Sequence, residues 1–266
     1  MMESDLDLKI KLVADLIEDS GKIVVFTGAG VSTESGIPDF RGPGGIWNRF
    51  DPDDFTIHKF LQSAETRKRQ WKILVGEGLF SHIKPNKAHY AIAELEALGR
   101  LDCVITQNID NLHQKAGNSP DKIFELHGNM KRARCLDCHT IFSIEYVAQM
   151  LRDGIEEPPC RKCFGTLKPD VVFFGEALPE KAMEAATFHS SECDLFIVVG
   201  SSLLVQPAAF MPVYAKDGGA KLVIINIGDT PLDVEADVLI NKSAGDIMDR
   251  IVGLVREDMR SVSQRT

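Results

Sequence analysis

Short apolar runs alternate with helix-spaced apolar residues through most of the chain. The first run, Ile23 to Phe26, lies between turn residues and is typical of a strand buried on both faces of a parallel sheet. Similar runs predict strands at 102–106, 123–126, 171–174, 194–199, 222–225 and 238–240. Helical spacing predicts helices at 5–19, 88–98, 179–190, from about 207, and at 244–259. This alternation predicts an α/β fold with a doubly wound parallel sheet.

Two stretches depart from this rhythm. Between 41 and 85, apolar residues are scattered among charges, which predicts an inserted module of short helices, the clearest over 66–74. Between 131 and 165, two Cys-X-X-Cys pairs stand among prolines and charges. We therefore expect a Rossmann-like nucleotide-binding domain at 1–40, 86–130 and 166–266. The smaller domain would combine the helical module, 41–85, with the cysteine module, 131–165.

The cysteine module predicts a metal centre. Cys135 and Cys138 form one pair and Cys160 and Cys163 the other, and four thiolates suit tetrahedral zinc. Disulfides are one alternative, but the chain shows no secretory signal. A thioredoxin-like redox pair is another, but that would be a single pair at a helix start. We predict one structural zinc ion, because four sulfur ligands leave no position open for water.

Composition narrows the classes of function. The chain has 266 residues, is 44% hydrophobic and carries a formal net charge of −9. An acidic protein is a poor generic binder of nucleic acid and a better host for a basic peptide. No apolar stretch reaches the roughly 18 residues of a membrane span, and the acidic start does not resemble a signal peptide. We expect a cytoplasmic protein with no membrane or direct nucleic-acid contact.

The turn after the first strand is a candidate phosphate site. Gly28 and Gly30 let the backbone turn sharply beside a ligand, and residues 31–33 can open a helix toward an anion. An ordinary strand-to-helix turn is the alternative, because Gly-X-Gly alone is weak evidence. The loop at 36–42 adds a carboxylate, an aromatic ring and a guanidinium, and such loops often hold ligands.

Polar residues also follow the next two predicted strands. Gln107 to Asp110 come after one, and His127 comes after the other, ahead of Gly128. Ligands of open α/β sheets bind outside the carboxyl ends of strands, so these groups are expected at one edge. A lone histidine is more often structural, but His127 in this setting could be a general base toward a sugar hydroxyl. The histidines without this setting are interpreted as surface or helix residues: His58, His82, His89, His113 and His189.

Together these motifs resemble those of the sirtuins, which are NAD-dependent protein-lysine deacylases, and most of all the compact bacterial and archaeal members. The matches run in the family's order over nearly the whole chain: 28–32, 36–42, 107–110, 127–128, the cysteine pairs, 173–176, 200–203 and Asn226. The resemblance implies that NAD is consumed as a co-substrate. The products would be nicotinamide, free lysine and an O-acyl-ADP-ribose, O-acetyl-ADP-ribose for the main substrate.

The resemblance also implies residue roles. His127 would be the general base and Asn108 its catalytic partner. The residues that would hold NAD are Gly28, Ala29, Gly30, Thr33, Phe40, Arg41, Gln107, Asn108, Ile109, Asp110, His127, Gly200, Ser201, Ser202, Asn226, Asp246 and Ile247. An extended substrate peptide would pair with strand-like edges, and the residues expected there are Val172, Phe173, Phe174, Gly175, Glu176, Leu203 and Val205. Glu176 and the general acidity would accommodate basic flanking residues.

Two further features concern the reaction. Thr33 occupies the position of the third glycine in the fingerprint of hydride-transfer dehydrogenases. The carboxylate that binds ribose in those enzymes, at the end of a second strand ~20 residues later, is also missing. Both observations favour cleavage of NAD over its reduction. The stretch 67–75 is apolar at Ile73, Leu74 and Val75 and has no tyrosine. Sirtuins that prefer succinyl or malonyl groups carry a tyrosine and an arginine here. An apolar pocket disfavours a carboxylate, so we expect acetyl or longer acyl chains.

Several alternatives stay open. The same chemistry would permit protein mono-ADP-ribosylation or long-chain deacylation. A non-enzymatic alternative is a zinc-ribbon interaction module on an inactive nucleotide-binding domain. Nucleic-acid binding through the cysteine module has some support from Lys131, Arg132 and Arg134, although the net charge of −9 disfavours it. The expected partners are proteins that contain acetyl-lysine, with basic chromatin proteins or metabolic proteins as candidates.

Overall fold

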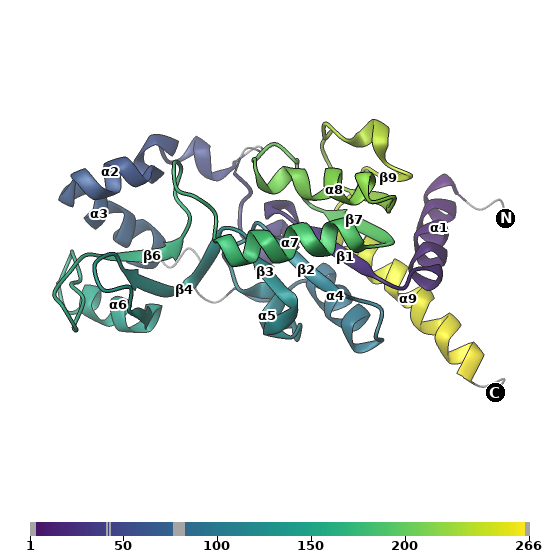
Figure 1. Ribbon diagram of the computed structural model, residues 1–266, viewed down its shortest axis with the longest axis horizontal. Coiled ribbons are helices and arrows are strands. Elements are labelled where there is room, and N and C mark those ends of the chain that lie inside the picture. The colour runs from purple at the N-terminus through teal and green to yellow at the C-terminus, as the bar shows by residue number, and fades with distance from the viewer. Residues whose placement is uncertain (1–3, 41, 43, 77–82, 264–266) are drawn as a thin grey trace.

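The structure is a computed structural model that describes residues 4–263 except 41, 43 and 77–82. It is elongated, with a larger part that contains both termini at one end and a smaller part at the other (Figure 1). The larger part is built on a parallel sheet, and the smaller part on an antiparallel sheet with helices beside it.

Within the described residues, six parallel strands form the large sheet in the order β3-β2-β1-β7-β8-β9. The strands are Ile23–Thr27 (β1), Cys103–Thr106 (β2), Ile123–Glu125 (β3), Leu195–Val199 (β7), Lys221–Ile225 (β8) and Val238–Ile240 (β9). In chain order this is the arrangement of a dinucleotide-binding Rossmann sheet, whose order reverses between the first and fourth strands. The predicted doubly wound sheet is confirmed, and its switch point lies between β1 and β7.

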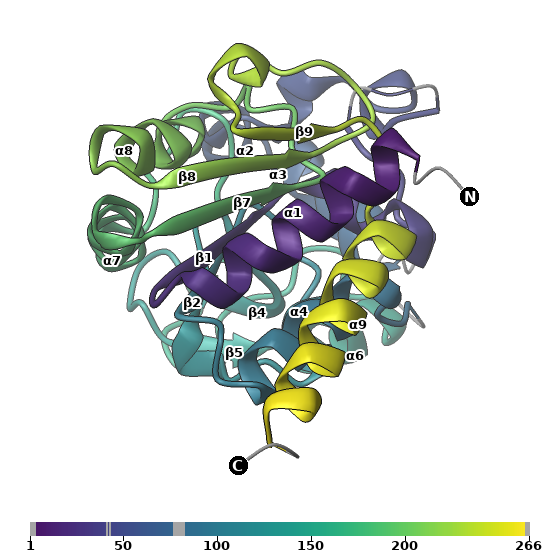
Figure 2. The same ribbon diagram turned by 90° about the vertical axis from the view of Figure 1, so that its right-hand side faces the viewer.

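Helices cover both faces of this sheet (Figure 2). One face carries α1 (Asp5–Asp19), α4 (Lys87–Ala97) and α9 (Ala244–Ser263), and the other α7 (Glu180–Glu192) and α8 (Met211–Asp217). The alternation of β1 explains both layers, because Ile23 and Val25 pack into the first core and Val24 and Phe26 into the second. All five residues of β1 are buried, as the apolar run predicted.

The smaller part joins the cysteine module to the helical module. An antiparallel sheet is formed by three strands, β4 (Gly128–Cys135), β5 (Ile141–Ser143) and β6 (Leu167–Val171), in the order β5-β4-β6. The helix α6 (Ile144–Arg152) packs against β4 and β5. The helical module contains α2 (Ile57–Gln62) and α3 (Ala64–Trp71), and α3 continues as a π-helix at Lys72–Gly76. Trp71 is fully buried in one core with Cys135 and Cys160, so the two modules form one packed unit.

Some sequence predictions are wrong in detail. The strand expected at 171–174 in the parallel sheet is instead β6, which ends at Val171 and pairs antiparallel with β4. The helix expected at 66–74 changes to π geometry after Trp71. The remaining short helix, α5, spans Leu112–Ala116. The domain division stays a prediction, and the pairing of β6 with β4 favours moving residues 128–130 and 166–171 into the smaller domain.

Candidate active site

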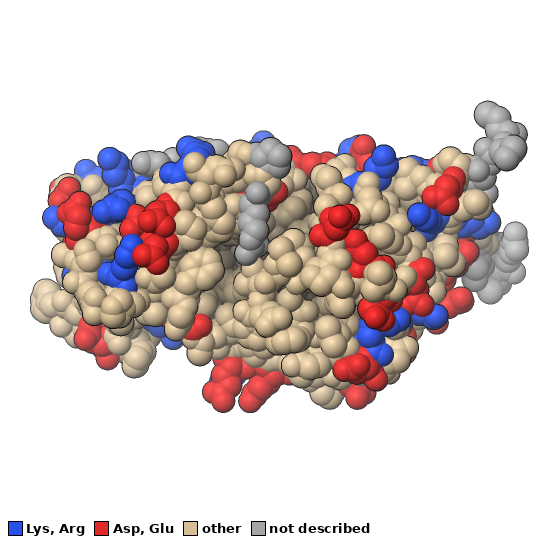
Figure 3. All heavy atoms as spheres, turned by 90° about the horizontal axis from the view of Figure 1, so that it is seen from above, with Lys and Arg blue, Asp and Glu red and all other residues tan. Residues whose placement is uncertain are grey.

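Two cavities open at the carboxyl edge of the large sheet, where the larger and smaller parts meet. The large cavity, of about 490 Å³, extends along the switch point, and the apolar cavity, of about 260 Å³, extends toward the helical module. Six residues line both cavities: Ala29, Phe40, Gln107, Asn108, His127 and Val205. In the space-filling view, the middle of the molecule is hollowed and mostly uncharged, with charges gathered toward both ends (Figure 3).

The floor of the large cavity is made by two backbone turns in direct contact. The N–H of Gly30 donates to the carbonyl oxygen of Gly200 over 2.8 Å. A Cβ atom added at Gly28 or Gly30 would lie 2.8 Å from that same oxygen, so a side chain at either position would separate the turns. The predicted helix opening is a 3₁₀ helix, Ala29–Ser35, which ends at Gly36 with φ of 89°.

Asn108 is held by its backbone and its side chain. Its N–H donates to Oγ1 of Thr106 over 3.0 Å. Its Nδ2 donates to the carbonyl oxygen of Gly28 and to Oγ of Ser32, both over 3.1 Å. These bonds use both amide hydrogens, so the side-chain oxygen is the group of Asn108 that can accept a hydrogen bond from a ligand.

His127 has one ring nitrogen committed to the protein. Its Nδ1 lies 2.9 Å from the carbonyl oxygen of Gln107. A carbonyl oxygen only accepts hydrogen bonds, so Nδ1 carries the proton and the neutral ring has its lone pair on Nε2. Burial lowers the pKa of His127, although the bond to Gln107 acts in the opposite direction. The ring is therefore held neutral and oriented beside both cavities, as a general base requires.

A buried polar network lies behind these residues. The Oγ of Ser32 donates to Asp110 over 2.7 Å, and Oγ1 of Thr27 lies 2.9 Å from Nε2 of His113. The ring of His89 lies 5.0 Å from that of His113, measured between centroids. Burial lowers the pKa of His89 to about 4, lowers the pKa of His113 well below its ordinary value, and raises the pKa of Asp110.

His89 and His113 lie on helices, α4 and α5, in keeping with their interpretation as surface or helix residues, but both side chains are buried rather than at the surface. Their positions in the sequence pattern could have indicated this burial. His113 continues the polar run that starts at Gln107, directly after a strand, and His89 lies on the apolar face of the predicted helix at 88–98. Neither signal identifies the surroundings of the two rings, because His113 contacts Thr27, 86 positions away, and His89 contacts its near neighbour Asn86.

Most of the predicted ligand residues line a cavity. The large cavity is also lined by Thr33, Gly200, Ser201, Ser202 and Asn226. The apolar cavity is also lined by Ile109, Asp110, Val172, Phe173, Phe174, Gly175 and Glu176. Ser201 connects the end of β7 to the end of β2, because its Oγ donates to Oε1 of Gln107 over 2.8 Å.

Other predicted residues lie elsewhere. Asp246 is exposed and pairs with Nζ of Lys87 at 2.7 Å, while Ile247 is buried in the core of the large sheet. Leu203 packs into the core on the other face of that sheet. Among the described residues, none of these three lines either cavity. Arg41 lies outside the described residues.

The apolar cavity has walls that the sequence analysis did not assign. The ring of Trp47 lies 5.3 Å from that of Phe40 and 5.8 Å from that of Phe174, measured between centroids. The predicted Ile73 and Leu74 line the cavity as well. The aromatic content of 47–55 was the available signal, but a scattered pattern does not show which rings face one space.

The predicted peptide edge is only partly available. The N–H of Phe174 donates to the carbonyl oxygen of Phe55, and its carbonyl oxygen accepts from Ile57, both over 3.0 Å. Glu176 does not offer a free charge, since its Oε2 accepts from Nζ of Lys168 over 3.0 Å and from the N–H of Phe173 over 2.7 Å. The expectation that Glu176 faces basic flanking residues is therefore not supported by its contacts.

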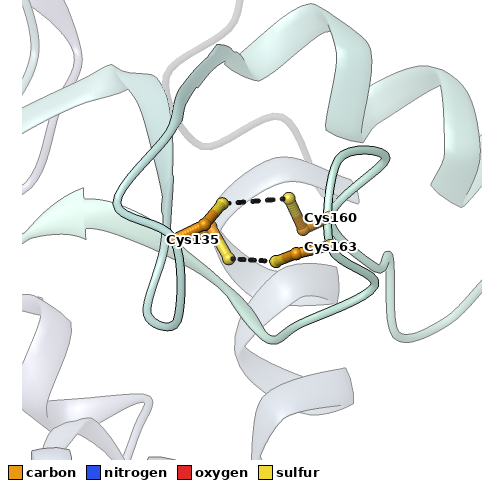
Figure 4. A group of neighbouring side chains, drawn as sticks. Cys135, Cys160 and Cys163 are labelled. Atoms are coloured by element: carbon orange, nitrogen blue, oxygen red, sulfur yellow. Dashed lines mark hydrogen bonds between the residues drawn. The ribbon is translucent and has the colours of Figure 1, made fainter.

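The four predicted cysteines converge at the end of the smaller part. The Sγ atoms of Cys135 and Cys163 lie 3.5 Å apart, and those of Cys138 and Cys160 lie 3.7 Å apart. A tetrahedral zinc ion with bonds of ~2.3 Å holds its sulfur ligands ~3.8 Å apart. Figure 4 shows Cys135, Cys160 and Cys163 turned toward one another. All four ligand atoms lie within 4.8 Å of one another, so the donor set fits structural zinc.

Comparison with known proteins agrees with this geometry. The model of the Sir2 family matches residues 28–207. NAD-dependent protein deacylase 2 of Pyrobaculum aerophilum is 43% identical, over 94% of this chain and 97% of that protein. NAD-dependent protein deacetylase of Thermodesulfovibrio yellowstonii is 44% identical, over 94% of this chain and 96% of that protein. The structure of a Sir2 variant with a deacetylated p53 peptide and 3'-O-acetyl ADP ribose has a TM-score of 0.83 and 40% identity, over 92% of this chain and 97% of that one.

Proposed function

Because this chain belongs to the Sir2 family, we propose that its two joined cavities are the site of an NAD-dependent protein-lysine deacetylase. The chain cleaves NAD and transfers the acyl group of an acyl-lysine to ADP-ribose. The observation that carries the proposal is that His127 and Asn108 line both cavities. One side chain can therefore contact a sugar in the large cavity and an acyl group in the apolar cavity.

NAD occupies the large cavity in this proposal. The phosphates lie at the turns around Gly30 and Gly200, which contact each other through their backbones and line the cavity. Asn226 and Ser202 contact the adenosine half, and Asn108 offers its side-chain oxygen to the nicotinamide ribose. Ile109 and Asp110 contact the nicotinamide amide, and Phe40 shields the sugar after nicotinamide departs. The predicted contacts of Arg41, Asp246 and Ile247 with NAD stay predictions.

His127 performs the proton transfer. When the acyl oxygen has replaced nicotinamide on the ribose, Nε2 of His127 accepts the proton of a neighbouring ribose hydroxyl. That hydroxyl oxygen can then bond to the acyl carbon, and water completes the release of lysine and O-acyl-ADP-ribose. The bond from Nδ1 to Gln107 keeps the ring in the tautomer that this step needs. The lowered pKa keeps it unprotonated near neutral pH.

The four-cysteine centre holds structure in this proposal. Four thiolate ligands fill the shell of a zinc ion, so the ion offers no site to a substrate. Its ligands Cys135 and Cys160 share a core with Trp71, which immediately precedes the π-helix that carries Ile73 and Leu74. The zinc ion thus supports a wall of the apolar cavity.

The lining of the apolar cavity favours acyl chains longer than acetyl as additional substrates. Its walls include Ile46, Trp47, Phe50 and Leu74, and its volume is about 260 Å³, more than an acetyl group fills. Longer fatty acyl chains are therefore candidate substrates beside acetyl. A dicarboxylic acyl group would bring a charge into this apolar space and is disfavoured.

Other proposals concern partners and location. Among the described residues, no helix is long and apolar enough to cross a membrane. We propose a cytoplasmic enzyme that acts on proteins with acyl-lysine, basic chromatin proteins among them. Nucleic-acid binding by the cysteine module is disfavoured by its ion pairs, since Arg132 and Arg134 both contact Asp170.

Mass spectrometry of the products tests this function. The chain is incubated with NAD and peptides that carry acetyl-, decanoyl-, myristoyl- or succinyl-lysine. Free lysine and an O-acyl-ADP-ribose are expected with acetyl or fatty acyl peptides only. ADP-ribose attached to protein would show transfer instead. Release of nicotinamide without any acyl peptide, or no release at all, would contradict the proposal.

A further inference from the structure

Lys168 places a buried ammonium group directly behind the apolar cavity. It lies on β6, and its side chain is 7% exposed. Its Nζ contacts Oε2 of Glu176 at 3.0 Å and donates to the carbonyl oxygens of Pro169, over 3.1 Å, and of Val171. It also lies 4.3 Å from the centre of the Phe173 ring. All three N–H bonds of the ammonium group thus have an acceptor.

A buried charge is costly, and a packed apolar side chain often stabilises a fold equally well. Burial accordingly lowers the pKa of Lys168, while Glu176 raises it. Asp170 and Arg134 also act on this group, and their opposite charges partly cancel. Packing alone therefore does not explain a lysine at this position. Its explanation is that the ammonium group holds the neighbouring backbone in one conformation.

The contacts given above for the Lys168 ammonium group all fall on one segment, 169–176. Glu176 closes that segment into a turn, because its N–H donates to the carbonyl oxygen of Phe173 over 3.0 Å and its carboxylate accepts from the N–H of Phe173. Gly175 has φ of 86°, which allows this turn. At the other end, the N–H of Val172 donates to the carbonyl oxygen of His127 over 2.9 Å.

We propose that Lys168 is a positioning residue for the acyl-lysine substrate. Its ammonium group fixes Val171 to Glu176 in the shape that forms the wall of the apolar cavity, and so sets where an acyl-lysine lies relative to His127. Lys168 lines neither cavity among the described residues, so it acts through Phe173 and Glu176. This inference rests on the proposed deacylase function.

Replacement of the lysine separates this role from general stability. Lys168→Met keeps an unbranched side chain that is one atom shorter and removes the charge. We expect the KM for an acetyl-lysine peptide to rise about tenfold or more, because small misplacements of a substrate have large effects. The KM for NAD should change less than about threefold, whereas kcat should fall together with the peptide affinity, because the acyl group is no longer held in place relative to His127. Lys168→Arg keeps the charge and should recover part of the peptide affinity.

A double-mutant cycle with Glu176→Gln tests whether the two side chains act as one unit. If they do, the variant with both substitutions has about the same peptide KM as either single variant, and the effects are not additive. Glu176→Gln also serves if Lys168→Met does not fold. Lys131→Met is the matched control, since Lys131 also lies in the small sheet and has only an exposed ion pair with Glu145.

The outcomes distinguish this inference from the function it rests on. An unaltered chain that does not deacetylate any peptide contradicts the proposed function. An active chain whose Lys168→Met variant keeps its peptide KM, or loses affinity for NAD and peptide equally, contradicts the role of Lys168. Zinc content and melting temperature are measured for each variant, and titration calorimetry with the acetyl-peptide gives its affinity independently of turnover.

Discussion

The Nδ1 atom of His127 lies 2.9 Å from the backbone carbonyl oxygen of Gln107, at the point where the two cavities meet. Gln107 in turn accepts a hydrogen bond from Ser201, on the other side of the switch point. The orientation of the base is therefore tied to the ends of β2 and β7.

Acid should inactivate the enzyme below the ordinary pKa of histidine. Burial lowers the pKa of His127 beneath 6.5, so the neutral base persists as the pH falls through that value and is lost only at lower pH. We expect the acid limb of kcat/KM to have its midpoint below pH 6.5, measured with a peptide that has no group titrating there. A midpoint clearly above 6.5 would contradict the assignment. Circular dichroism at each pH separates loss of the base from unfolding.

Loss of the imidazole should remove catalysis and leave the fold. His127→Ala is expected to reduce kcat by about 10² to 10⁴-fold, the range for a general base. Zinc content and melting temperature should stay close to those of the unaltered chain. His58→Ala is the control, because His58 is exposed on α2 and should have no effect on rate. Activity above a few per cent of the original in His127→Ala would exclude it as the base.

A methyl group between the two turns should close the large cavity to NAD. In Gly30→Ala the new Cβ would lie 2.8 Å from the carbonyl oxygen and 2.9 Å from Cα of Gly200, and both are backbone atoms that cannot rotate away. We expect NAD affinity to fall sharply and the melting temperature to decrease. Gly253→Ala lies in α9, where the nearest atom is 3.9 Å away, and should raise stability by about 0.5–1 kcal/mol. Normal NAD binding by Gly30→Ala would show that NAD does not need the close contact between these turns.

Removal of zinc should be reported by Trp71. The chain has two tryptophans, and in a Trp47→Phe background Trp71 alone reports on the core that contains Cys135 and Cys160. A strong chelator, or Cys160→Ser, should shift its emission to longer wavelength and abolish deacylation together. Cys193→Ser should keep one zinc per chain, because Cys193 is buried in a different core. Unchanged Trp71 emission in the metal-free protein would contradict the coupling.

The fold itself should lose stability in mild acid. His89 and His113 have pKa values lowered by burial, so the unfolded chain binds more protons than the folded one below pH 6.5. The free energy of unfolding should therefore be constant above that pH and fall between 6.5 and about 4, by on the order of 3 kcal/mol for His89. His89→Gln should flatten this dependence in urea titrations. An equal slope in both proteins would mean that other groups cause it.

The local sequence pattern was sufficient to predict features that depend on a single element or on equivalent positions of the sheet. The run Ile23 to Phe26 has no polar residue, which is typical of a strand covered on both faces. His127 and Asn108 each follow a predicted strand, and the carboxyl ends of parallel strands meet at one edge of the sheet. The cysteine spacing identified the metal centre in the same way. Each of these inferences uses residues that are close in the sequence or equivalent in the sheet.

The rest depends on partners that the local pattern does not contain. The apolar run at 171–174 looks like any buried strand, and only its pairing with β4 shows that it leaves the small sheet at Val171. His89 is buried against Ser32 and His113, which come from other elements. Lys168 and Glu176 are eight positions apart, with no helical or strand periodicity that would bring a lysine and a glutamate together.

The large sheet ends its third strand at Glu125, and the small sheet begins at Gly128, so His127 stands in the joint between them. His127 is also bonded to both parts, because its Nδ1 contacts the carbonyl oxygen of Gln107 and its own carbonyl oxygen accepts from the N–H of Val172. A change in how the two parts are packed would therefore act directly on the residue that takes the proton.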